Sequence, residues 1–147
     1  MLDATLKETN IWRSIKKFFI ENTGSGSPSY PVYFDRVIVA GNFTDEQWIN
    51  VTVENVIPNY VSHAVMTIYL CSRFDREGDE LACMRDFVLQ YLYSGYIDLY
   101  DTTTDPWKKI GAMKLFIKEQ SDTLYNPDRS KMIYFLCLLK WGAVWSR

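Results

Sequence analysis

The chain has 147 residues, a net charge of −2 and a composition that is 48% hydrophobic, 16% aromatic and 23% charged. This length and hydrophobicity predict a single domain over residues 1–147 with a packed core, and they exclude a disordered chain. The near-neutral charge without a basic stripe argues against sequence-independent nucleic-acid binding as the main activity. No apolar stretch approaches the roughly 20 residues that cross a bilayer, so we expect a cytoplasmic chain with no membrane partner.

Aromatic residues are the unusual part of the composition. The 10 Tyr, 8 Phe and 5 Trp exceed what one small core needs. Because aromatic side chains are enriched at protein interfaces, their excess predicts large contact surfaces with partners. Cys71, Cys83 and Cys137 match neither a disulfide framework nor a zinc motif and are interpreted as reduced thiols.

The first predicted element is an amphipathic helix over residues 2–22. Its later apolar residues, Ile11, Trp12, Ile15, Phe18 and Phe19, recur at helical spacing with basic residues between them. The glycine, serine and proline of the following segment, 22–31, predict irregular structure.

Strands follow. Residues 31–39, 46–54 and 62–74 are rich in β-branched and aromatic residues, and the middle segment alternates apolar with polar positions, so they predict three antiparallel strands. The third segment is apolar on both faces, which is typical of a central strand that is covered on both sides.

A second helix and further strands complete the pattern. Apolar residues from Leu81 to Leu92 have helical spacing, and Gly95 follows as a natural left-handed end. Residues 96–101, 111–120 and 131–145 predict strands, and 101–109 and 125–130 carry turn residues. The fold class is therefore predicted as α+β, a mostly antiparallel sheet with two amphipathic helices packed on one face.

The acidic stretch between Cys71 and Cys83, "CSRFDREGDELAC", raises the question of a metal site. An EF-hand loop that began at Asp75 would place glycine at its fourth position, whereas calcium coordination needs glycine at the sixth. We interpret the stretch as a joint in which Gly78 turns the chain and Asp79 caps the second helix.

Other candidates for chemistry are weak. His63 is the only histidine and no nucleophile motif accompanies it, so it is interpreted as structural. Asp98, Asp101 and Asp105 flank a threonine-rich loop and are carboxylates that Mg²⁺ accepts, but solvated turn residues are the simpler interpretation. We therefore expect no catalytic residue, no metal and no cofactor.

Several stretches carry a resemblance to a known family. "YPVYFDRV", "QWINV", the long segment from Val61 to Leu92, "DLYD", "PWKKIGAM" and "LKWGAVW" together resemble the tail terminator, or tail completion, proteins of long-tailed bacteriophages. The resemblance covers most of residues 30–145. It implies a ring-forming α+β subunit, commonly a hexamer, that caps the tail tube, stops its polymerisation and meets the head connector. Its partners would be other copies of itself, the tail tube protein and a neck protein, with genome DNA only passing through the lumen. Its location would be the virion tail, and the host cytoplasm during assembly.

Two alternatives remain open at this point. A neck or head-completion protein, such as a connector stopper, also uses a small ring-forming subunit. A hydrolase or a small-ligand-binding domain would use an aromatic-lined pocket. For the interface itself, the predicted loop residues are Tyr30, Tyr33, Trp107, Lys108 and Lys109. Trp107 is the expected anchor because its turn-rich neighbours do not bury it completely, and the alternative is that it folds back onto the apolar face of Met113 and Leu115.

Overall fold

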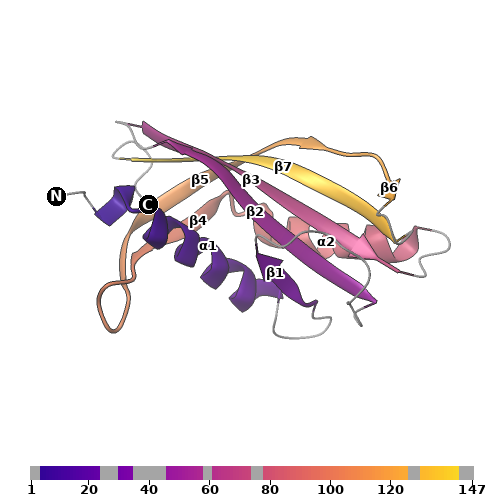
Figure 1. The fold of residues 1–147 in the computed structure, drawn as a ribbon, viewed down its shortest axis with the longest axis horizontal. Coiled ribbons are helices and arrows are strands. Elements are labelled where there is room, and N and C mark those ends of the chain that lie inside the picture. Colours follow the sequence, from indigo (N-terminus) through magenta and orange to yellow (C-terminus); the bar gives the residue numbers. More distant parts are fainter. Residues whose placement is uncertain are drawn as a thin grey trace.

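The computed structural model describes residues 4–23, 30–34, 46–57, 61–73, 78–125 and 130–142. A long curled sheet extends along the molecule, and two helices lie beneath it in Figure 1. In chain order the elements are η1 (Ala4–Leu6), α1 (Glu8–Thr23), β1 (Val32–Phe34), β2 (Gln47–Ile57), β3 (Val61–Ser72), α2 (Asp79–Leu92), β4 (Tyr96–Asp101), β5 (Lys108–Gln120), β6 (Leu124–Tyr125) and β7 (Lys131–Gly142). The α+β class with two helices is confirmed, and strands dominate.

The sheet is mixed. Its strand order is β1-β2-β3-β7-β5-β4, with β6 paired to β7. All described pairs are antiparallel except β1 and β2, which run parallel with Val32 opposite Ile49. The expectation that the first strand is antiparallel is therefore wrong. Residue alternation does not report strand direction, which depends on how the connection crosses the sheet. The rest of the predicted strand, 35–39, lies outside the described residues.

Alternating burial along the central strands defines two faces of the sheet. In β3, the fully buried Ala64, Met66, Ile68 and Leu70 alternate with half-buried residues, and β7 repeats the pattern. The buried set faces the helices. The opposite side, called the outer face below, presents half-buried side chains such as Val65, Leu136 and Leu138, and no described helix covers it.

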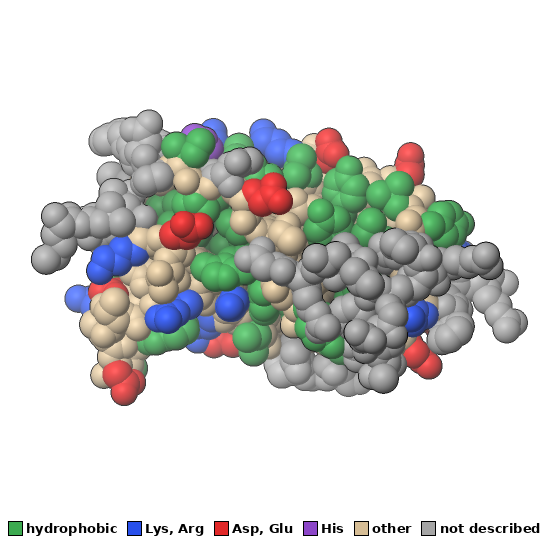
Figure 2. All heavy atoms as spheres, in the orientation of Figure 1, with side chains coloured by type: hydrophobic (Ala, Val, Ile, Leu, Met, Phe, Trp, Pro, Cys, Tyr) green, Lys and Arg blue, Asp and Glu red, His purple; other side chains and the backbone are tan. Residues whose placement is uncertain are grey.

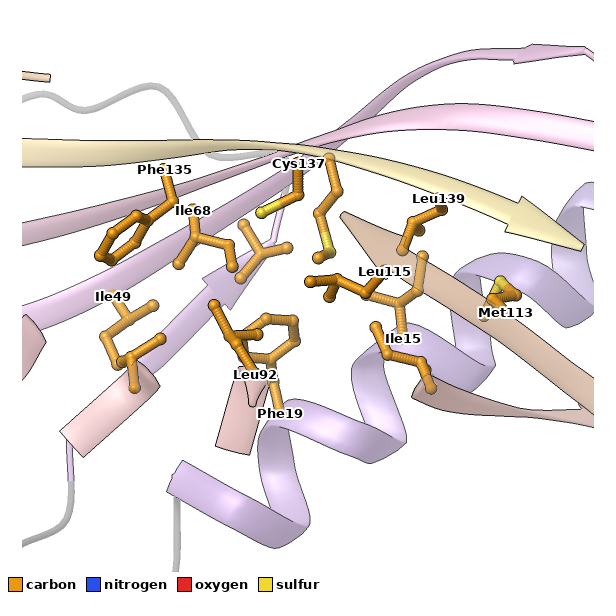
Figure 3. Close-up of a cluster of buried hydrophobic side chains, with 14 of the residues drawn as sticks. Ile15, Phe19, Ile49, Ile68, Leu92, Met113, Leu115, Phe135, Cys137 and Leu139 are labelled. Atoms are coloured by element: carbon orange, nitrogen blue, oxygen red, sulfur yellow. The ribbon is translucent and has the colours of Figure 1, made fainter. Parts of the chain in front are cut away.

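The core lies between the sheet and the two helices. In Figure 3, Ile15 and Phe19 of α1 and Leu92 of α2 point toward Cys137 and Leu139 of β7. One cluster of buried side chains includes residues from α1, α2 and the sheet strands. One side of each helix packs into this cluster, which accounts for the amphipathic pattern of both helices. Within the described residues, neither helix is long and apolar enough to cross a membrane.

Helix α1 reaches both edge strands of the curled sheet. On one side, the ring of Trp12 packs edge-to-face on Phe34 of β1, with centroids 5.7 Å apart. On the other, Ser14 Oγ accepts the backbone N–H of Tyr100 in β4 at 2.9 Å. Asn10 Oδ1 accepts the Thr102 N–H just beyond β4 at 3.0 Å. Backbone donors at this sheet edge are thus satisfied by a helix instead of by another chain.

The start of α2 differs from the predicted cap. Gly78, at φ 83°, occupies the N-cap position, and the cap makes no side-chain hydrogen bond. Asp79 is the first helical residue, so the prediction that Asp79 is the N-cap is wrong. The left-handed conformation at residue 78 favours glycine, and this backbone requirement shifts the helix start by one residue. Asp79 and Glu80 instead place negative charge in the first turn, where the helix dipole favours it.

Strand β5 is longer than its pattern indicated. It begins at Lys108, and Asp101 of β4 pairs with Lys108 across a connection of residues 102–107. Lys108 and Lys109 are therefore strand residues, not part of the turn. This end of the strand is exposed to solvent, so its residues are polar. They belong to the strand through backbone pairing with β4 and not through burial, which is why the hydrophobic pattern did not indicate them.

Candidate interaction surface

A group of large side chains on α1 lies beside the β4–β5 connection. A shallow groove of about 390 Å³ is lined by Arg13, Lys16, Lys17, Ile20, Glu21 and Trp107, and we call these six residues the Trp107 surface. Ile20 is 57% exposed and Trp107 is 42% exposed. Two large apolar side chains left in water beside three cations form a surface of the composition that protein interfaces favour.

Neighbouring rings and hydrogen bonds position this surface. The Trp107 ring lies 6.5 Å from that of Tyr100, and the Lys17 ammonium lies 5.3 Å from the Tyr100 ring. Lys17 also pairs with Glu21, a hydrogen bond that raises the pKa of the lysine. Arg13 donates to the Thr102 hydroxyl at 3.3 Å. These contacts join α1 to the connection that holds Trp107.

Figure 2 shows this side of the molecule with side chains coloured by type. In the left half, around α1, several Lys and Arg side chains lie among apolar and acidic ones. Mixed cationic and apolar character is favourable for a protein contact, because the stems of the basic residues cover apolar area while their charges stay hydrated.

The sequence-predicted interface residues occupy two separate places. Trp107, Lys108 and Lys109 lie together at the β4–β5 connection, and Trp107 is partly exposed as expected. Lys109 binds Asp98 at 3.2 Å. Tyr33 is half-buried within β1.

Tyr30 is only 8% exposed, so the expectation of an exposed loop residue is wrong there. Its ring packs edge-to-face on Phe87 of α2 at 5.2 Å, and burial raises the pKa of its hydroxyl. A core contact of this kind removes Tyr30 from the candidate surface.

Of the three carboxylates that flank the threonine-rich loop, Asp101 supports its turn. Asp101 Oδ1 accepts hydrogen bonds from the Thr103 hydroxyl at 2.6 Å and from the Thr103 N–H at 3.0 Å, which lowers the pKa of Asp101. Asp98 is engaged by Lys109, and Asp105 precedes Pro106 on an exposed turn. In the described part of the chain, no group of three metal-ligating side chains is assembled.

His63 lies on β3 with its partners in the sheet. It is half-buried and stands opposite Lys140 of β7.

The acidic stretch has Cys71 buried and Cys83 exposed, and residues 74–77 between them lie outside the described residues. Glu80 accepts hydrogen bonds from Gln47 and from the Ser72 hydroxyl, which joins α2 to the ends of β2 and β3.

A second groove, of about 430 Å³, lies between α1 and β2. It is lined by Glu8, Thr9, Ile11, Trp12, Arg13, Lys16, Val53 and Val56. Its volume is in the range of small-ligand sites. Neither histidine nor cysteine is among these lining residues, and the charged groups in the groove are Glu8, Arg13 and Lys16.

Sequence reasoning missed the α1 half of the Trp107 surface. Ile20 is apolar but lies off the buried stripe formed by Ile11, Ile15 and Phe19, and this mismatch was a usable signal. That Ile20 lies beside Trp107 is a tertiary fact, since 86 intervening residues separate the two in the chain.

Comparison with known proteins identifies the fold but no family. No family model matches the chain, and no curated protein matches it by sequence. One similar solved structure superposes with a TM-score of 0.58 at 9% identity. The match covers 91% of this chain and 94% of that one. At such low identity the likeness shows that the α+β arrangement recurs in another protein over nearly its whole length.

Proposed function

We propose that the protein is a tail terminator of a long-tailed bacteriophage, a structural subunit without enzymatic activity or cofactor. Copies of the chain form a ring, a hexamer in the form we propose, on the last ring of the tail tube. The ring stops tube polymerisation and presents its other side to the head connector. Genome DNA passes through the lumen, and the protein resides in the virion tail.

The Trp107 surface is the observation that carries this proposal from the structure. A subunit that only folded would gain by burying Trp107 and Ile20, whose exposed fractions are 42% and 57%. Truncation of an aromatic anchor in an interface commonly costs about 2 kcal/mol or more. The outer face of the sheet adds a second surface of half-buried apolar residues. An assembling subunit needs several contact surfaces, for its neighbours and for each end of the ring.

The choice of a tail terminator among assembling proteins rests on the sequence stretches that resemble that family. They fall on β1, β2, β3, α2, β4, β5 and β7, so the resemblance follows the sheet and α2 rather than one loop.

The decisive experiment removes the protein from a phage that encodes it and examines the particles by electron microscopy. A terminator leaves tube growth unchecked, so we expect tails of irregular, excessive length that do not join heads. Tails of normal length beside unjoined heads would instead identify a neck or head-completion protein. Normal, infectious particles would refute both the terminator role and the neck role, and would favour the small-ligand-binding or hydrolase alternative.

Copy number in the virion provides the second measurement. Quantitative mass spectrometry of purified particles is expected to count one ring of this chain per tail. A single copy per particle would contradict a ring.

A further inference from the structure

Three lysines converge on one aromatic ring of the outer face. The ammonium groups of Lys114, Lys118 and Lys140 lie 5.9, 5.9 and 5.8 Å from the centroid of Phe116. Lys114 also lies 4.7 Å from the ring of Tyr96. We call Lys114, Lys118, Lys140 and Phe116 the lysine cluster. Attraction to the ring faces partly offsets the crowding of the charges.

Strand pairing makes this cluster unfavourable for folding. Lys114 of β5 stands directly opposite Lys140 of β7, and Lys140 stands opposite His63 of β3. Like charges directly opposite each other across a sheet destabilise it. Among the described residues, no carboxylate forms an ion pair with any of the three lysines. An anionic partner outside the subunit would relieve the repulsion.

The surroundings of the cluster favour a protein partner over nucleic acid. Phe116 pairs with Leu138, and Val65 and Leu136 continue the half-buried apolar surface beside it. A phosphate backbone requires an extended basic track, whereas this chain has a net charge of −2 and three lysines around a ring. An acidic surface with an aromatic or apolar component fits better.

The chain itself presents such a surface on α2. Asp79, Cys83, Asp86, Gln90 and Tyr93 follow one another at spacings of three and four residues, so they form one side of the helix; we call them the α2 stripe. All five are exposed, and Tyr93 is 84% exposed, the largest value among the exposed large hydrophobic residues. The Asp86 side chain is 75% exposed, and within the described residues its ion pair is with the neighbouring Arg85. Leu81, Met84, Val88 and Leu92 on the opposite side of α2 face the core.

The two surfaces lie on opposite layers of the subunit. The lysine cluster is on the outer face of the sheet, and the α2 stripe is on the helix layer, directed away from that sheet. Two different, complementary surfaces produce a head-to-tail contact, and head-to-tail contacts close into rings when the rotation allows.

We infer that the lysine cluster of one copy binds the α2 stripe of the next copy. The inference rests on the proposed ring, and it names the residues by which neighbouring subunits meet. Asp79 and Asp86 would face the three ammonium groups, and Tyr93 would pack on the apolar residues around Phe116.

Native Cys83 allows a direct test, because it is exposed whereas Cys71 and Cys137 are buried. Lys118→Cys places a thiol in the lysine cluster at an exposed position, and copper–phenanthroline oxidises neighbouring thiols to a disulfide. We expect intermolecular linkage between residues 118 and 83, identified by peptide mass spectrometry. Thr103→Cys, also at an exposed position but on the β4–β5 connection, is the matched control and should not link to Cys83. Only 83–83 linkage, equal linkage from Thr103→Cys, or no linkage at millimolar protein would overturn the inference.

Charge reversal provides the second arm. Asp86→Lys and Lys140→Glu should each weaken self-association about tenfold or more, measured by analytical ultracentrifugation, because like charges then meet across the contact. The double variant should recover at least part of the loss. Unchanged association of both single variants, or a double variant weaker than either, contradicts the contact. If Lys140→Glu instead abolishes only the binding of duplex DNA, the occupant is nucleic acid and the inference is wrong.

The outcomes separate this inference from the proposed function. Linkage of residues 118 and 83 in a protein whose removal leaves tails normal would retain the contact and reject the terminator role. A ring on the tail whose copies never link these residues would retain the role and reject the contact.

Discussion

Two of the three cysteines are buried and one is exposed, and burial determines their chemistry. Burial raises the pKa of the Cys137 thiol to about 12, so thiolate, the reactive species, is nearly absent at neutral pH. Cys71 is also buried, whereas Cys83 is exposed on α2.

We therefore predict that one thiol per folded chain reacts with Ellman's reagent, at Cys83, and that all three react in denaturant. Cys83→Ser should remove the fast phase and leave the melting temperature nearly unchanged. Fast reaction at Cys71 or Cys137 in the folded protein would contradict the packing of β3 and β7.

Two tryptophans provide a matched comparison at the same scale. Trp141 is 1% exposed and its indole N–H donates to the Thr5 carbonyl at 2.8 Å, whereas Trp107 is 42% exposed. We predict that Trp141→Ala lowers the free energy of unfolding by about 3–5 kcal/mol. Trp107→Ala should lower it by less, about 2 kcal/mol, because 42% of the residue surface is already in water.

The effects of the two variants on phage assembly should follow the reverse order of their effects on stability. In phage assembly, Trp107→Ala is expected to give tails that overgrow or fail to join heads while the subunit stays folded. Urea denaturation of both variants and electron microscopy of the particles test this. A loss for Trp107→Ala as large as that for Trp141→Ala would place Trp107 in the core and discard the interface assignment.

At the scale of elements, the contact between α1 and β4 closes one edge of the sheet with polar side chains. Asn10, 1% exposed, accepts the Thr102 N–H at 3.0 Å and the Thr102 hydroxyl at 2.8 Å, and donates to the Ala4 carbonyl at 3.0 Å. A buried donor left without its acceptor costs about 1–3 kcal/mol.

We therefore predict that Asn10→Ala lowers the free energy of unfolding by about 1–3 kcal/mol and speeds hydrogen exchange at the Thr102 amide. Asn22→Ala is the control, because Asn22 donates only to Phe18 within its own helix, among the bonds that the structure describes. It should leave the Thr102 amide protected. Equal exchange in both variants would refute the role of α1 in protecting this edge.

The lysine cluster gives a second prediction about an element, in the opposite direction. Lys140→Glu places a carboxylate opposite Lys114, so a repulsive cross-strand pair becomes attractive. We predict that the variant unfolds with a free energy about 0.2–1 kcal/mol higher, measured in urea, although it associates less well. Lys131→Glu on the same strand, opposite Ser72, is the control and should lack the gain. A destabilised Lys140→Glu monomer would show that the three lysines do not repel in the folded subunit.

At the scale of the whole molecule, the proposed ring joins surfaces of opposite charge. Salt screens charge pairs, with a Debye length of about 10 Å at 0.1 M and about 3 Å at 1 M ionic strength. We predict that self-association, measured by sedimentation, weakens between these salt concentrations, and that Lys140→Glu is less sensitive to salt than the native chain. Association that strengthens with salt would indicate a contact governed by apolar burial instead.

Local sequence patterns predicted the helices and strands of this protein better than they predicted which residues meet on its surface. The sequence predicted the alternation in β3 and β7 and the apolar stripe of α1, because each reflects which side of a single element faces the core. The parallel pairing of β1 depends on the path of the chain around the sheet. The start of α2 depends on the left-handed backbone of Gly78, so Asp79 became the first helical residue instead of its cap.

The candidate site divides in the same way. The exposure of Trp107 followed from its polar, turn-forming neighbours, which is a property of local sequence. Tyr30 also has polar and turn-forming neighbours, but tertiary packing buries it against Phe87. The sequence by itself determined the α+β class, the two amphipathic helices and the partial exposure of Trp107, because side-chain periodicity and turn chemistry act over a few residues. Only the tertiary structure placed Ile20 beside Trp107 and brought Lys114, Lys118 and Lys140 around Phe116, because strand pairing and helix packing join residues that are distant along the chain.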